Sequence, residues 1–149
     1  MTYPIFSDEY FMNIALKEAM KATDRDEIPV GAVIVTKNRI IARAHNQTQT
    51  LLDVTAHAEM LAITAAASNL GSKYLHHCTL YVTLEPCIMC GSATAWAQIP
   101  RIIYGARDPK AGYSKIIQDI LHPRTEVKAG VLEQECAGLL KDFFRDKRE

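Results

Sequence analysis

Hydrophobic and polar positions along the chain follow two different periods. Apolar residues that recur every three or four positions predict helices, and runs of β-branched and apolar residues predict strands. We expect helices over residues 7–23, 57–69, 87–98, 114–121 and 132–147. We expect strands over residues 30–36, 40–44, 79–83, 101–104 and 126–128. Because helices and strands alternate, the pattern predicts a three-layer α/β/α fold with a five-strand mixed sheet.

Polar residues and glycines mark the ends of these segments. Ser7 can cap the first helix, Asp53 or Thr55 can cap the second, and Gly71 can end the second. The polar turn over residues 37–39 separates the first two strands, which predicts an antiparallel hairpin.

The spacing of the last two strands predicts their direction. Residues 106–125 lie between them, which is more than a hairpin needs and enough for a parallel crossover. We therefore expect strands 4 and 5 to run parallel, with the helix over residues 114–121 as the crossover.

Composition bounds the class of protein. The chain has 149 residues, 48% hydrophobic and 23% charged, so residues 1–149 are expected to form a single domain. No apolar run reaches the ~18 residues of a membrane span, and no signal-peptide pattern is visible. Four cysteines in such a chain favour the reducing cytoplasm. Lysine plus arginine and aspartate plus glutamate balance at 17 each, so net charge by itself leaves a nucleic-acid partner open.

Residues 80–90 carry the strongest chemical signal. Apolar residues lead into Glu85-Pro86, and Cys87 and Cys90 follow at the expected start of a helix. Two cysteines three apart on a helix point the same way, and the positive end of the helix dipole favours their thiolates. They can therefore grip one metal ion between them.

A third ligand is offered by His57, with Glu59 two residues later. A catalytic zinc takes three protein ligands and leaves its fourth position to water, so His57, Cys87 and Cys90 make a complete set. Glu59 is then the candidate general acid and base. A thioredoxin-like redox site or a structural zinc site are the alternatives, but neither has a use for Glu59. The two remaining cysteines, Cys78 and Cys136, are interpreted as packing residues.

This order, H-x-E followed by P-C-x-x-C, is the signature of zinc-dependent base deaminases. The chain resembles the cytidine and deoxycytidylate deaminase superfamily, and within it the bacterial tRNA-specific adenosine deaminases. The stretches that carry the resemblance are Ile28–Val33, Ala44–Asn46, Thr55–Glu59, Leu80–Cys90, Tyr104–Asp108 and Leu139–Arg145.

The resemblance implies one zinc ion per chain and the conversion of adenosine to inosine at the wobble position of a tRNA anticodon loop. It also implies a homodimer with its active site at the subunit interface. By the residues alone, Asn46 could either close a turn or read the edge of a base. The resemblance favours the base, and it places these further residues at the substrate: Pro29, Ala58, Asp108, Phe143 and Phe144.

Two stretches keep other functions open. Residues 112–117 read Gly-Tyr-Ser-Lys-Ile-Ile where many tRNA-editing relatives have a small, glycine-rich stretch. Trp96-Ala97 resembles guanine deaminases, so a small-molecule deaminase acting on guanine, cytosine or deoxycytidylate is the alternative. If RNA is the substrate, local basic residues must contact its phosphates, because the whole chain is neutral. The candidates are Lys110, Lys115, Arg145, Lys147 and Arg148.

Overall fold

A computed structural model describes residues 2–148. The helices are α1 (Asp8–Thr23), α2 (Ala58–Leu70), α3 (Ile88–Trp96), α4 (Tyr113–Ile116) and α5 (Glu133–Arg148), with a 3₁₀ turn, η1 (Gln118–Ile120), after α4. The strands are β1 (Gly31–Thr36), β2 (Arg39–His45), β3 (Thr79–Leu84), β4 (Arg101–Ala106) and β5 (Glu126–Ala129). None of the helices in this part of the chain is long and apolar enough to cross a membrane.

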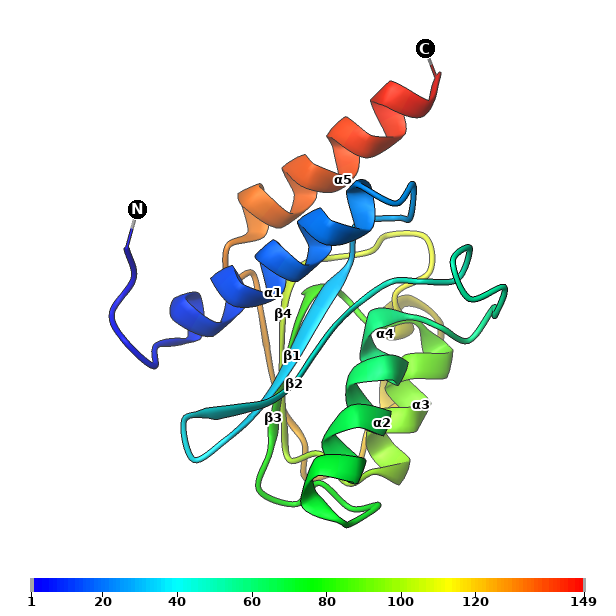
Figure 1. Ribbon diagram of the computed structural model, residues 1–149. Helices are drawn as coiled ribbons and strands as arrows, with labels where there is room; N and C mark the ends of the chain where they lie inside the picture. Colours follow the sequence, from blue (N-terminus) through cyan, green and yellow to red (C-terminus); the bar gives the residue numbers. More distant parts are fainter. Residues whose placement is uncertain (1, 149) are drawn as a thin grey trace.

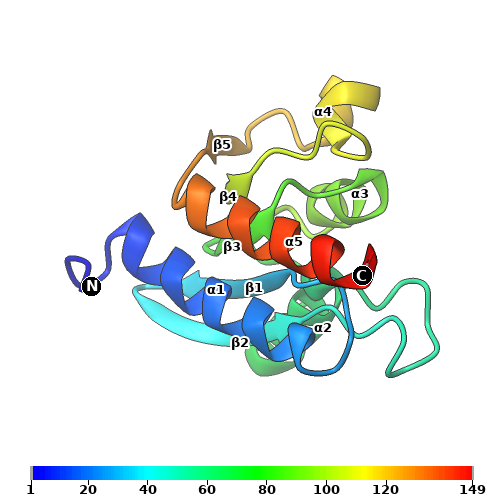
Figure 2. The same cartoon turned by 90° about the horizontal axis from the view of Figure 1, so that it is seen from above.

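The five strands form one mixed sheet in the order β2-β1-β3-β4-β5. β1 pairs antiparallel with β2 and β3, whereas β3, β4 and β5 run parallel. Helices α1 and α5 lie side by side on one face of the sheet, and α2 and α3 cover the other (Figures 1 and 2). The predicted three-layer fold and the parallel pairing of the last two strands are confirmed.

Strand β1 shows why both faces must be covered. Its alternate side chains Ala32 and Ile34 pack in the cluster that contains α2, and Val33 and Val35 pack in the cluster that contains Phe11 of α1. A strand buried on both faces needs apolar residues at every position. This explains the nearly continuous apolar run of β1.

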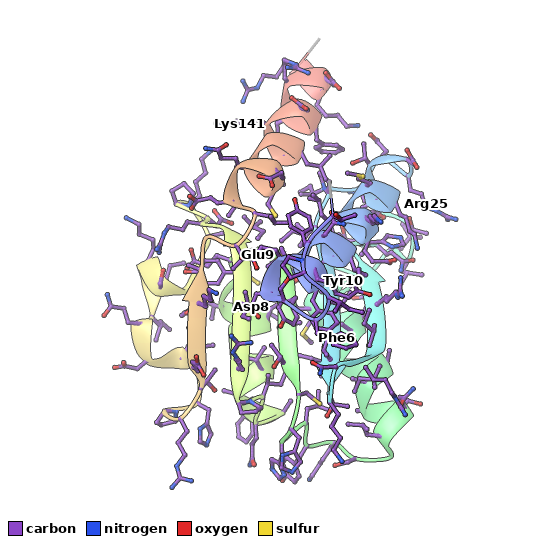
Figure 3. All side chains as sticks on the ribbon, turned by 90° about the vertical axis from the view of Figure 1, so that its left-hand side faces the viewer. Phe6, Asp8, Glu9, Tyr10, Arg25 and Lys141 are labelled. Atoms are coloured by element: carbon purple, nitrogen blue, oxygen red, sulfur yellow. The ribbon has the colours of Figure 1, made fainter. Side chains whose placement is uncertain are left out.

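The start of α1 is tied to the sheet by one carboxylate (Figure 3). Asp8 accepts hydrogen bonds from the Tyr81 hydroxyl at 2.9 Å, from the Arg101 guanidinium at 3.1 Å and from Lys128 Nζ at 2.9 Å. These partners come from β3, β4 and β5, so one residue joins α1 to three parallel strands.

Several boundaries differ from the sequence-based expectations. The predicted helix over residues 114–121 is wrong: α4 has four residues, because Ile117 adopts an extended conformation (φ −138°, ψ 99°) before η1. Helix α3 ends at Trp96 rather than near residue 98, since Gln98 has a positive φ of 59°.

One cap differs from the prediction, and two agree with it. Neither Asp53 nor Thr55 caps α2; the N-cap is His57, and Asp53 instead accepts hydrogen bonds from the amide and hydroxyl of Thr55. Ser7 does cap α1, where its hydroxyl oxygen accepts from the Tyr10 amide at 3.1 Å. Gly71 ends α2 in the left-handed conformation that glycine adopts without strain.

Candidate zinc and catalytic site

The N-termini of α2 and α3 meet at the same edge of the sheet. His57 is the N-cap residue of α2, Cys87 is the N-cap residue of α3, and Cys90 lies in the first turn of α3. The donor atoms of His57, Cys87 and Cys90 all lie within 4.8 Å of one another. The fold therefore brings together all three residues that the sequence predicts as metal ligands.

The spacing of these donors fits a tetrahedral zinc ion. His57 Nδ1 lies 3.7 Å from Cys87 Sγ and 3.5 Å from Cys90 Sγ. Zinc bonds of ~2.3 Å to sulfur and ~2.0–2.1 Å to nitrogen place such atoms about 3.6 Å apart at a tetrahedral angle. Two soft thiolates and one imidazole are also the donor set that zinc prefers.

The two thiols are not equivalent in the metal-free chain. A hydrogen bond from Cys90, assisted by His57 and opposed by burial, lowers the pKa of Cys87 to about 4. The same hydrogen bond, together with burial, raises the pKa of Cys90. Because zinc binds cysteine as the thiolate, the buried Cys90 has to lose its proton when a metal binds.

Glu59 lies in the first turn of α2 and is only 4% exposed. Burial raises the pKa of its carboxyl group to about 7. A carboxyl group with a pKa near neutrality can both accept and donate a proton within one catalytic cycle. Glu59 therefore has the environment of a general acid and base.

A cavity of about 160 Å³ lies beside these groups. Its lining includes His57, Ala58, Glu59, Glu85, Cys87, Asn46, Ile28, Val30, Leu84, Asp108 and Ala111. The lining is mostly apolar with a few convergent polar groups, as in small-molecule and base pockets.

Asn46 lines this cavity and carries a buried acceptor atom without a partner. Its Nδ2 donates to the Ile28 carbonyl at 3.3 Å, while its Oδ1 is buried and has no partner among the described residues. A buried polar atom without a partner is costly unless a ligand satisfies it. Asn46 thus lies where it can accept a hydrogen bond from a bound base.

The other predicted substrate residues lie at different distances from the catalytic groups. Ala58 and Asp108 line the cavity, whereas Pro29 is buried and its neighbours Ile28 and Val30 line the cavity instead. Asp108 and Phe144 share a second hollow of about 510 Å³. Phe143 lies in a separate hollow with Thr23, Asp26 and Lys147.

Sequence reasoning missed Glu85 as a residue of the cavity. It is 3% exposed and follows directly after β3. The available signal was a glutamate between a strand with a buried interior and the proline of the cysteine motif. Such a position is buried, so its carboxylate needs hydrogen-bond partners.

Residues 6–106 match the model of the cytidine and deoxycytidylate deaminase zinc-binding region. The chain belongs to this family. Family membership, with the fitting donor set, makes the cluster of His57, Cys87 and Cys90 a zinc site and the protein a zinc-dependent hydrolase. The redox and purely structural interpretations are thereby excluded.

Similar proteins share one name within this family, tRNA-specific adenosine deaminase. The chain is 46% identical over 147 residues to the tRNA-specific adenosine deaminase of Bacillus subtilis, covering 95% of this chain and 91% of that protein. It is 47% identical over 144 residues to the enzyme of the same name from Agrobacterium fabrum, covering 93% and 95%. The resemblance noted in the sequence is confirmed.

Solved structures agree on the fold. A structure from a study of A-to-I editing by tRNA:A34 deaminases superposes with a TM-score of 0.83 at 46% identity, covering 88% of this chain and 99% of that one. A guanine deaminase from Bacillus subtilis matches with a TM-score of 0.68 at 36% identity, covering 79% of each chain.

Proposed function

We propose that this chain deaminates adenosine to inosine in tRNA, at the wobble position of the anticodon loop. The carrying observation is that the cavity beside the zinc ligands lies next to the larger hollow beneath α5. Four residues line both spaces: Ile28, Leu84, Asp108 and Ala111. A free base needs only the cavity, whereas a nucleotide within a chain needs room for its neighbours. The tRNA-specific relatives support the same conclusion.

The larger hollow, which we call the α5 groove, has the surface that a nucleic acid prefers. Its lining comprises Ile28, Leu84, Ala106, Arg107, Asp108, Pro109, Lys110, Ala111, Ala137, Leu140, Phe144 and Arg148. Phe144 is 42% exposed and offers an aromatic face for stacking. Arg107, Lys110 and Arg148 supply positive charge, against one acidic lining residue, Asp108.

The catalytic groups suit hydrolytic deamination. His57, Cys87 and Cys90 would hold the zinc ion, which would make hydroxide available at neutral pH. Hydrolysis adds water at C6 of adenine and releases ammonia, leaving inosine. Glu59 is the buried group that can take a proton from water, pass it to a ring nitrogen, and then protonate the leaving amine.

Asn46 is proposed to hold the base. Its unpaired Oδ1 can accept a hydrogen bond from the base or its sugar, while its Nδ2 remains bonded to the Ile28 carbonyl. The target base must leave its stack to enter the cavity, which a loop nucleotide does at low cost.

We also propose that the active form is a homodimer. Large apolar side chains are exposed near the catalytic edge and along α3: Trp96 is 81% exposed, Leu52 90% and Val54 84%. Ile116 and Ile117 are about half exposed. Such residues are usually covered by a partner in a stable protein.

An enzyme of this kind would work in the cytoplasm, where tRNA and reduced thiols coexist.

A guanine deaminase is the second candidate, favoured by the 36% identity to the Bacillus subtilis enzyme. The two functions are separated by supplying equal concentrations of an anticodon stem-loop RNA, free adenosine, guanine, cytosine and deoxycytidylate. Inosine in the RNA is detected by A-to-G readout and the other reactions by ammonia release. Glu59→Gln serves as the control for contaminating activity. Release of ammonia from guanine without any A-to-G change in RNA would overturn the proposal.

A further inference from the structure

Glu85 is a buried carboxylate that binds a loop rather than a cation. It is 3% exposed, and none of the described lysines, arginines or histidines forms an ion pair with it. Its Oε1 accepts a hydrogen bond from the Asp108 amide at 3.1 Å. Its Oε2 accepts from the amide and the hydroxyl of Ser114, at 3.1 and 2.5 Å. Three donors on one carboxylate offset the cost of burying its charge.

The segment that Glu85 binds, Asp108–Ser114, also has hydrogen bonds of its own. Asp108 Oδ1 accepts hydrogen bonds from the amides of Lys110 and Ala111, both at 3.0 Å. Gly112 packs directly against Glu85, where an added Cβ would lie 2.4 Å from Cδ of the carboxylate. The segment therefore closes around Glu85 and leaves no room for a side chain at position 112.

The same segment is fastened to the residues that lead into the zinc site. The Tyr113 amide donates to the Pro86 carbonyl at 2.9 Å, and the Glu85 amide donates to the Ala106 carbonyl at 2.8 Å. Glu85 and Pro86 directly precede Cys87. The turn Glu85-Pro86-Cys87 thus carries a zinc ligand and also anchors the Asp108–Ser114 segment.

The anchored segment forms the boundary between the two substrate spaces. Asp108 and Ala111 line both the catalytic cavity and the α5 groove, and Lys110 lines the groove. A loop in this place must keep its shape if the base and its neighbouring nucleotides are to enter together. Disorder there would weaken substrate binding and leave the catalytic groups intact.

We propose that Glu85 is a positioning residue for the RNA substrate: its carboxylate preforms the Asp108–Ser114 segment as the ridge between the cavity and the groove. This inference rests on the proposed function. It also accounts for the unusual stretch over residues 112–117, because Ser114 supplies two of the three donors.

The test compares Glu85→Gln, Ser114→Ala and Gly112→Ala with the wild type on an anticodon stem-loop RNA. Glutamine keeps the size of glutamate but presents an amide NH₂ where the carboxylate had accepted a bond. We expect KM to rise about tenfold for Glu85→Gln, with kcat within about twofold and zinc content unchanged. Ser114→Ala in the Glu85→Gln background should add little, because Ser114→Ala removes only the hydroxyl hydrogen bond to Oε2, which Glu85→Gln already disrupts. The matched control is Ser72→Ala, which removes a similar serine turn at Tyr74, outside both spaces, and should leave KM unchanged.

Amide hydrogen exchange over residues 108–114 makes the result independent of the substrate. Exchange should accelerate in Glu85→Gln and in Ser114→Ala, but not in Ser72→Ala. A variant that loses both turnover and bound zinc would show that Glu85 acts on the metal site. A variant with unchanged KM and unchanged exchange would show that Glu85 does not position the segment. Either outcome overturns the inference. If Glu85→Gln does not fold, Ser114→Ala decides in the same way. If the wild type fails to deaminate RNA, the proposed function fails, and the exchange data still decide whether Glu85 anchors the segment.

Discussion

Lys147 and Asp26 form an ion pair that joins the last turn of α5 to the loop after α1. Arg145 is likewise paired, with Asp142 at 3.3 Å and Asp146 at 3.5 Å. Arg145 and Lys147, two of the basic residues predicted to contact phosphates, are thus already paired with acidic side chains. Lys110 and Arg148, in contrast, line the α5 groove.

Neutralising Lys110 and Arg148 together should therefore weaken RNA binding and flatten its salt dependence. Each phosphate contact that is lost lowers the slope of log K against log salt by ~0.7–0.9. The measurement is a salt titration of stem-loop binding to wild type, the double variant and Lys147→Ala. Lys147→Ala should keep the wild-type slope, and a wild-type slope near zero would remove RNA as the substrate.

Glu59→Gln should retain zinc and the fold but lose turnover. Glutamine matches the size of glutamate but cannot cycle a proton, and general acid–base groups contribute ~10²–10⁴ in rate. Single-turnover deamination and metal analysis on the same preparation test this. Retention of more than about a hundredth of the wild-type rate would assign the proton transfer to another group.

Cys87→Ala and Cys90→Ala should each lose zinc and unfold at a lower temperature, because the metal contributes to folding. Cys78→Ala is the control, since Cys78 is a buried cysteine outside the metal cluster. Zinc is measured after exhaustive dialysis. Stoichiometric zinc in either ligand variant would require a different donor.

Asp8→Asn should reduce stability at neutral pH, and this loss should shrink as the pH falls from about 4 toward 2. Burial alone would raise the pKa of Asp8, but hydrogen bonds from Arg101, Lys128 and Tyr81 lower it from 3.8 to about 2. A lowered carboxyl pKa stabilises the folded state above the unfolded value and loses that effect as the pH falls toward 2. The shift corresponds to about 2 kcal/mol at neutral pH.

Urea unfolding of wild type and Asp8→Asn between pH 7 and pH 3 measures this difference. Glu9→Gln is the matched control, because Glu9 lies in the same first turn of α1 but forms no ion pair with the described residues. A difference that stays constant down to pH 3 would assign the effect to packing instead of charge.

Trp96→Glu should convert the proposed dimer to a monomer and reduce activity on RNA. A charge placed in an apolar interface is desolvated without a partner. Sedimentation at several concentrations gives the oligomeric state. The control is Ile5→Glu. Ile5 is another exposed apolar residue, 70% exposed near the N-terminus, and its replacement should leave the oligomeric state unchanged. A wild-type monomer that is fully active on RNA would refute the dimer.

The sequence predicted the zinc ligands and the sheet because both depend on local patterns. The zinc ligands are recognisable by their spacing along the chain: His57, Cys87 and Cys90. The burial of β1 on both faces is visible in the sequence as an apolar run. The crossover after β4 was not predictable in the same way. The helix over residues 114–121 was inferred from the length of the crossover, but the extended conformation of Ile117 ends α4 after four residues. The length of a crossover does not report where its backbone leaves the helical conformation.

Asn46 shows a similar limit. The residues left a turn and a base contact equally open, and the buried Oδ1 without a partner, which supports the proposed base contact, is a feature of the packed structure. For Pro29 the sequence predicted a substrate contact, but the residues of this motif that line the cavity are its neighbours Ile28 and Val30.

The zinc ligands stand at the beginnings of two helices, thirty residues apart along the chain. An ion held there fastens α2 to α3 as a cross-link does, so the supply of zinc becomes a determinant of how long the protein persists. A free-zinc concentration a hundred times the Kd would add about 2.7 kcal/mol to the free energy of unfolding. Metal starvation would then both stop catalysis and expose the chain to proteolysis, so the abundance of the enzyme would follow the metal status of the cell.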